Sequence, residues 1–256
     1  MLSTITLASE AQFPETIIIS AEEYPPFTTT QLKHNGLMSH IVTEAFILEN
    51  ITVEYRFLSA ARSLLTARDG QVDGTLPWAM RADRNIDFYY SDPILDVGEE
   101  HFFFKKNSAI NWEPIKRDYS KLKGLKVGVI IAYDYGDRFQ KAKNNKVFEF
   151  IEIRSLNQLF KMLLADRIDV VISKELVAEY TLENEFTSYE QNQITSLPEI
   201  IAAPSYDYLL LSKKRPSAEY FLNALNRGLK KLHLSGRYDE LIDNYSKGEY
   251  LLDLPN

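Results

Sequence analysis

The sequence predicts an α/β protein built as two lobes, and three observations support that prediction. Short runs rich in β-branched residues alternate with stretches of helical periodicity, as in folds whose sheets are mostly parallel. The alternation occurs twice, on either side of a polar stretch over residues 106–123. Extended segments near residues 101–106 and 206–212 join the two series, so the chain is expected to cross between the lobes twice. A ligand cleft is expected between the lobes, beyond the C-terminal ends of the strands.

The first series begins with a strand over the apolar run Thr16–Ser20. A helix is expected after Gly36, because Ile41, Ala45 and Leu48 recur there at helical spacing. The other elements predicted in this series are strands at Thr52–Leu58, Val72–Leu76 and His101–Lys105, and helices at Ala60–Ala67 and Asp83–Ile86.

The second series and the closing helices follow the polar stretch. Its predicted elements are strands at Lys126–Ile131, Val147–Ile153, Asp169–Ile172 and Tyr206–Leu211, and helices at Tyr135–Lys143 and Leu156–Leu164. Two helices then close the chain, from about Ser217 to Leu234 and over Tyr238–Tyr245. Ser217 is a candidate N-cap and Gly236 fits a C-cap. We therefore predict one lobe from residues 12–104 and 207–256, and a second from residues 105–206.

Composition bounds the possible functions. The chain has 256 residues, 45% of them apolar and 25% charged, and a formal net charge of −7. An acidic balance without a basic face argues against nucleic-acid binding. The absence of cysteine excludes disulfides, thiolate metal sites and a cysteine nucleophile. The four histidines show no metal-ligand spacing, and no phosphate-binding loop or hydrolase motif occurs, so neither a metal nor a cofactor is expected. No apolar stretch is long enough to span a membrane.

Residues 1–11 leave two interpretations open. The small and apolar residues of this segment, ending at Ala11, are similar to the end of a secretory signal with its cleavage site. The basic start of such a signal is missing, so the segment is either a signal-peptide remnant or a frayed N-terminus.

Several short motifs follow one another along these elements. They are EYPPF at 23–27, NGL at 35–37, GQVDG at 70–74, ADR at 82–84, YSDP at 90–93, LKGLKVGV at 122–129, DRIDVV at 166–171, LNRGL at 225–229 and SGRY at 235–238. In this order and spacing, from about residue 16 to 245, they resemble the bacterial extracellular solute-binding proteins of family 3, the amino-acid-type binding components of ABC importers. The resemblance implies a two-lobed periplasmic-binding-protein fold (type II-like) that closes on a small solute.

Arg84 is the main candidate for ligand binding. Its guanidinium can pair bidentately with a carboxylate, and the resemblance implies that the arginine before the YSDP turn binds the ligand carboxylate. Arg81 is the alternative, and a surface arginine paired with Asp83 or Asp87 is the plain structural interpretation.

Other candidates in the first lobe surround this position. The resemblance implies an aromatic wall at Tyr24, and Phe27 of the same loop is a further candidate. Trp78 leaves a strand end and either lines the cleft or packs in the core. Ala79 stands where the family usually has a Ser or Thr, which removes one polar contact. Arg62 is expected to point into the cleft or to solvent.

The second lobe departs most from the family pattern. Tyr133 and Asp134 follow a strand where the family has a Gly-Thr or Gly-Ser pair, so the hydroxyl is lost and only backbone donors are left to meet a carboxylate. The charge of Asp134 would repel a carboxylate there, and capping of the following helix is the favoured interpretation of this residue. Lys174 stands where amino-acid binders usually have the aspartate that holds the ammonium group. A lysine reverses the sign there, which favours a ligand without an ammonium or with a second anionic group, unless Lys174 points to solvent or Glu175 turns in.

Three functions follow from these features. The first is a non-enzymatic, extracytoplasmic (periplasmic) and monomeric binding protein that delivers a small polar or anionic solute, amino-acid-like or a carboxylate, to an inner-membrane ABC permease. The second is a ligand-sensing domain for a membrane signalling partner. The third is an enzyme resembling cyclohexadienyl dehydratases, for which Glu175 is the only candidate acid or base.

Overall fold

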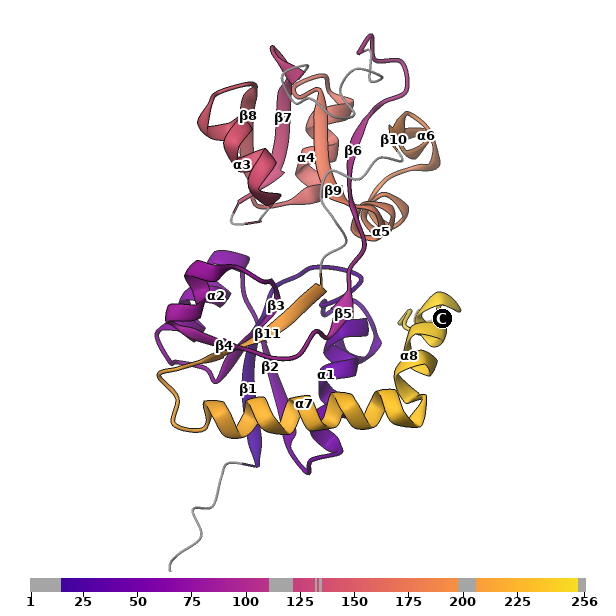
Figure 1. Ribbon diagram of the computed structural model, residues 1–256. Helices are drawn as coiled ribbons and strands as arrows, with labels where there is room; N and C mark the ends of the chain where they lie inside the picture. Colours follow the sequence, from indigo (N-terminus) through magenta and orange to yellow (C-terminus); the bar gives the residue numbers. More distant parts are fainter. Residues whose placement is uncertain (1–14, 111–121, 132, 134, 198–205, 253–256) are drawn as a thin grey trace, which may run out of the picture.

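The computed structural model describes residues 15–110, 122–131, 133, 135–197 and 206–252. It contains two sheets in two separate lobes, with β11 bringing the chain back to the first lobe (Figure 1). The predicted N-terminal signal remnant, most of the polar stretch at 106–123 and Asp134 lie outside the described residues.

The first lobe holds a sheet of strand order β2-β1-β3-β11-β4, with β5 paired to β11. Its strands are β1 (Thr16–Ala21), β2 (Thr52–Phe57), β3 (Gly74–Ala79), β4 (Phe88–Tyr90), β5 (Leu95–Asp96) and β11 (Tyr206–Ser212). Its helices are α1 (Leu37–Ile47), α2 (Ala60–Arg68), α7 (Ala218–Ser235) and α8 (Arg237–Ser246), with short 3-10 turns η1 (Lys33–Asn35) and η2 (Ala82–Ile86). The largest core cluster packs α1 and α7 against β1 and β11.

The second lobe holds a sheet of strand order β10-β6-β9-β7-β8. Its strands are β6 (Glu100–Lys105), β7 (Lys126–Ile130), β8 (Glu149–Ile153), β9 (Val170–Lys174) and β10 (Ile194–Ser196). Its helices are α3 (Gly136–Asn144), α4 (Leu156–Leu164), α5 (Glu175–Glu185) and α6 (Ser188–Gln191). Two apolar clusters fill this lobe, one centred on Phe139 and the other on Phe160.

The predicted lobe boundary and sheet character need correction. β6 pairs with β9 and β10, so the chain enters the second lobe before Glu100 and not after residue 104. The sheets are also mixed and not mostly parallel. β1 pairs in parallel with β2 and β3, and β7 with β8 and β9, whereas β6 and β11 run antiparallel to their neighbours. Both exceptions are strands that arrive from the other lobe, so a helical crossover does not set their direction.

The strand that carries Trp78 is longer than predicted. β3 continues through Pro77 to Ala79 because Trp78 and Ala79 pair with Tyr208 and Asp207 of β11. The register shifts between Tyr208 and Leu210, opposite the proline. A proline has no N–H for the ladder, and this irregularity accommodates it inside the sheet. Trp78 therefore lies within the strand and does not follow its end.

The predicted series also omits β4, β5, α5, α6 and β10. Only Val177, Ala178 and Thr181 are buried in α5, so its sequence lacks the apolar stripe that marks a helix. The closing helices are found where expected, and Gly236 ends α7 in the left-handed conformation. Ser217 occupies the N-cap position, although its side chain makes no capping hydrogen bond.

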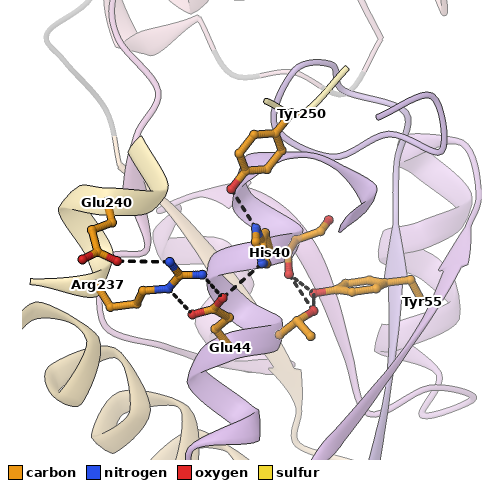
Figure 2. Close-up of polar contacts among 8 residues, drawn as sticks. His40, Glu44, Tyr55, Arg237, Glu240 and Tyr250 are labelled. Atoms are coloured by element: carbon orange, nitrogen blue, oxygen red, sulfur yellow. Dashed lines mark hydrogen bonds and ion pairs between the residues drawn. The ribbon is translucent and has the colours of Figure 1, made fainter. Parts of the chain in front are cut away.

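The C-terminal segment is tied to the first lobe through a polar cluster around His40 (Figure 2). The Tyr250 hydroxyl lies 2.8 Å from Nδ1 of His40, and Glu44 lies 3.2 Å from Nε2. Arg237 of α8 donates two hydrogen bonds to the Glu44 carboxylate, and His34 stacks on His40 with ring centroids 3.8 Å apart.

Among the described residues, no helix combines the length and apolarity that a bilayer crossing requires.

Candidate functional site

Two adjoining compartments lie between the lobes. The small compartment has a volume of about 60 Å³ and the large one about 630 Å³. The small compartment is lined by Glu22, Tyr24, Pro77, Trp78, Ala79, Arg84, Glu100, Tyr133, Lys174 and Asp207. Five of these residues, Glu22, Tyr24, Glu100, Tyr133 and Lys174, also line the large compartment. The large compartment extends between residues 57–61 of the first lobe and residues 154–157 of the second.

Arg84 lies at the end of the small compartment. η2 carries this side chain, which is only 8% exposed. Its Nη1 donates to the Ala79 carbonyl oxygen at 3.0 Å, and its guanidinium carbon lies 4.5 Å from the centre of the Trp78 ring. Burial lowers the pKa of this guanidinium. The ion pair with Asp83 is made by Arg81 and not by Arg84, so the surface-arginine interpretation is wrong.

Trp78 is anchored from behind by a buried hydrogen-bond chain. Its Nε1 donates to the Thr75 hydroxyl at 3.0 Å, and that hydroxyl lies 2.8 Å from the Ser63 hydroxyl of α2. The ring is buried with Phe88 and Leu210 and also faces the compartment, so it both packs in the core and lines the cleft.

Two buried carboxyl groups of the first lobe face Arg84. Glu22 follows β1 and is 7% exposed, and Asp207 lies near the start of β11 and is 6% exposed. Burial and the nearby Asp207 raise the pKa of Glu22 to about 8, although a hydrogen bond from Tyr133 opposes the shift. Burial raises the pKa of Asp207 to about 7 against the attraction of Lys174 and Arg84.

Lys174 reaches the same compartment from the second lobe. It is buried, and its Nζ donates to the Gly98 carbonyl oxygen at 2.8 Å, where the chain passes into β6. Glu100 is its direct partner in the β6–β9 register. The alternative that Lys174 points to solvent is therefore wrong. Glu175 lines neither compartment; its half-exposed carboxylate lies 3.8 Å from His101.

Two tyrosines meet across the cleft. The rings of Tyr24 and Tyr133 are 5.6 Å apart and nearly perpendicular, and Tyr133 also hydrogen-bonds to Glu22. Both hydroxyls are buried, which raises the pKa of each well above its usual range. Both residues line both compartments, so the pair lies where the two compartments adjoin and brings the lobes into contact.

The structure brings most of the predicted site residues together. Arg84, Tyr24, Trp78, Ala79, Tyr133 and Lys174 all line the small compartment. Two predictions need correction. Phe27 is 1% exposed and packs under Tyr24 in the core, because its apolar ring completes the cluster beneath the loop. Arg62 is an exposed residue of α2 and lines neither compartment.

The sequence reasoning missed Glu22, Glu100 and Asp207. A signal for each was available, because each acidic residue stands in or beside an apolar strand: TIIISAE, EHFFF and YDYLLL. Burying a carboxyl group in such a run costs folding free energy unless the group is paired or hydrogen-bonded, so its occurrence there suggests a function. Among the described residues, no group of three His, Asp or Glu side chains has the geometry to hold a metal ion.

The sequence matches one family model over residues 16–248, that of the bacterial extracellular solute-binding proteins, family 3. The chain belongs to this family. The match confirms the resemblance found from the motifs, and the solute-binding fold confirms the predicted fold class. No curated protein sequence matches this family member.

Solved structures similar to this solute-binding protein cover nearly its whole length. An ancestral arginine-binding protein bound to arginine has a TM-score of 0.75 at 17% identity, covering 91% of this chain and 99% of its own. The substrate-binding protein AbpA of Streptococcus pneumoniae, bound to L-arginine, has a TM-score of 0.73 at 17% identity, with 93% and 97% coverage. A histidine kinase sensor domain has a TM-score of 0.73 at 15% identity, with 90% and 96% coverage. At these identities the likeness shows the fold alone.

Proposed function

We propose that this chain is an extracytoplasmic, monomeric and non-enzymatic binding protein that captures a small, polar, amino-acid-like or carboxylate solute and delivers it to an ABC-type importer. The buried guanidinium of Arg84 at the end of an interlobe compartment is the observation that carries the proposal. A guanidinium has five N–H donors, and Nη1 is engaged by Ala79. Tyr90 also hydrogen-bonds to this side chain, and the donors that remain are suited to a ligand carboxylate.

Both lobes contribute to the compartments, which supports capture by closure. Tyr24 and Arg84 come from the first lobe, whereas Tyr133 and Lys174 come from the second. A ligand held between them joins the two halves, so its binding energy favours the closed state. The proposal is also in keeping with neighbours whose structures contain bound arginine.

A second candidate function is ligand sensing for a membrane signalling partner. The similarity to a histidine kinase sensor domain favours it, since the same cleft would serve either role. Co-purification with a permease or with a kinase distinguishes the two.

The experiment that tests solute binding is a thermal-shift screen of amino acids, dicarboxylates and small peptides. Ligands that bind the native state raise Tm. We expect Arg84→Ala to abolish the ligand-induced rise while the protein stays folded by circular dichroism. Arg81→Ala, which removes a partly exposed arginine three residues away, is the control and should respond like the unmodified protein. A full ligand response in Arg84→Ala would contradict the assignment.

A further inference from the structure

We propose that Asp207 and Glu22 form a subsite for a cationic group, so that the solute carries an ammonium or amidinium beside the group bound by Arg84. The inference rests on the proposed solute binding and assigns the chemistry of one end of the ligand. It places the cation on the first lobe, at β1 and β11, and not on the second lobe.

Asp207 is the observation that points to a ligand. Its side chain is more than nine-tenths buried and lines the small compartment. Its carboxylate makes no hydrogen bond or ion pair within 4 Å with any residue that the structure describes, and only the more distant charges of Lys174 and Arg84 act on it. A buried carboxylate without hydrogen bonds is costly, so its retention indicates a partner that arrives with the ligand.

The charges around the compartment favour the same ligand. Three carboxyl groups, Glu22, Glu100 and Asp207, face two cations, Arg84 and Lys174. The other titratable groups that line the compartment are the hydroxyls of Tyr24 and Tyr133. The hydroxyl of Tyr135 lies outside the lining but interacts electrostatically with Tyr24. With all five charged groups ionised the compartment carries one excess negative charge. A buried site of this kind binds a cation or retains a proton.

The two cations are already held by protein oxygens and rings. Lys174 donates to the Gly98 carbonyl, and Arg84 is stacked on Trp78 and donates to Ala79. Lys174 has only donors and cannot receive an ammonium group. All three carboxyl groups are acceptors once ionised. Glu100 lies directly beside Lys174 in the β6–β9 register, so Asp207 and Glu22, on the other lobe, are the acceptors placed away from that lysine.

A proton is the alternative occupant, and it gives the subsite a measurable signature. Burial raises the pKa values of Glu22 and Asp207 to about 8 and about 7, and the nearby Asp207 adds to the shift of Glu22. At neutral pH the ligand-free pair therefore holds a proton. An incoming ammonium favours the ionised carboxylates, so binding a cationic ligand releases that proton, whereas binding a purely anionic ligand takes up more.

The test uses matched probes on the whole protein. L-amino acids and the 2-hydroxy acids with the same side chains differ only in the ammonium group. Both sets, with dicarboxylates, are titrated calorimetrically at pH 7 in two buffers of different ionisation enthalpy. The variants are Asp207→Asn, which keeps the shape of the side chain, and Asp243→Asn, an exposed change on α8 as the control.

We expect an amino acid to bind more tightly than its hydroxy counterpart and to release protons. Asp207→Asn should weaken binding of the amino acid by about tenfold or more and leave binding of the hydroxy acid nearly unchanged. Asp243→Asn should change the affinity for neither. Hydroxy acids or dicarboxylates that bind as tightly as amino acids, or proton uptake on binding, would overturn the cation subsite and leave solute binding intact. A failure of every probe class to bind would overturn the proposed function and this inference together.

Discussion

The guanidinium of Arg84 lies over the indole ring of Trp78, 4.5 Å from the ring centre. The ring is held in turn by Thr75, so the arginine rests on a surface that the core itself positions. A long flexible side chain loses conformational entropy when it binds a ligand, and a side chain that is already restrained loses less. In the proposed function, the core of the first lobe therefore contributes to affinity by positioning Arg84 through Trp78.

Replacement of Trp78 should separate its two roles. Trp78→Phe keeps an aromatic face and loses the Nε1 hydrogen bond, which should cost about 1 kcal/mol of unfolding free energy. Trp78→Leu loses the aromatic face as well, so we expect the free energy of unfolding to fall by about 3 kcal/mol and ligand binding to weaken roughly tenfold. Urea unfolding and titration of a ligand found in the screen measure both. Equal affinities in the two variants would show that the ring face does not support Arg84.

Glu22 should make the ligand-free protein less stable as pH rises. Its pKa is about 8 in the fold and near 4.5 when unfolded, so the folded state holds the proton more tightly. The contribution is present below pH 4.5 and is lost as pH rises toward 8, at up to about 1.4 kcal/mol per pH unit. Urea unfolding between pH 5 and 9 should show a smaller loss for Glu22→Gln than for the unmodified protein. Glu23→Gln, an exposed neighbour, serves as the control, and parallel curves for all three proteins would contradict the prediction.

His40 should have the opposite effect at acid pH. Burial and the adjacent His34, with Arg237, lower its pKa to about 4, although Glu44 opposes the shift. Stability from the neutral ring is complete above about pH 6.5 and is lost as pH falls toward 4. His40→Gln should flatten the fall of Tm between pH 6.5 and 5, whereas His233→Gln on the exposed face of α7 should not. A His40→Gln protein whose Tm depends on pH like that of the unmodified protein would contradict the predicted role of His40.

Gly228 sets the distance between α1 and α7. A Cβ at this position would lie 2.1 Å from the Ala45 carbonyl oxygen, so the two helices would have to separate. We expect Gly228→Ala to cost about 3 kcal/mol in urea unfolding. Gly236→Ala is a matched change at the C-cap of the same helix, because its Cβ would meet open space and only the positive φ is strained. Gly236→Ala should lower the free energy of unfolding by about 1 kcal/mol. A Gly228→Ala protein as stable as the Gly236→Ala protein would show that the two helices separate easily.

Local pattern was enough to predict most of the elements, and the family resemblance pointed to Arg84. Leu156–Leu164 is a helix with the predicted bounds, and Gly236 ends α7 as expected, because periodicity and capping act within a few residues of the chain. Motif order likewise predicted the family, since each motif is a contiguous stretch. The strand at residues 100–105 was predicted as a strand but assigned to the wrong lobe. Its pairing with β9 and β10 depends on residues far along the chain, which local pattern does not indicate.

By itself, then, the sequence determined the alternation of strands and helices and the two-lobed class, and its motifs pointed to Arg84 as the arginine of the proposed site. Tertiary structure alone decided that Asp207 from the end of the chain faces Glu22 from its beginning, and that both face Arg84 and Lys174. Residues 185 positions apart have no common periodicity that could indicate this contact. Their charge environment arises only when β11 inserts beside β3 and the second lobe closes over the pair, so the chemistry of the site depends on burial that no local stretch of sequence records.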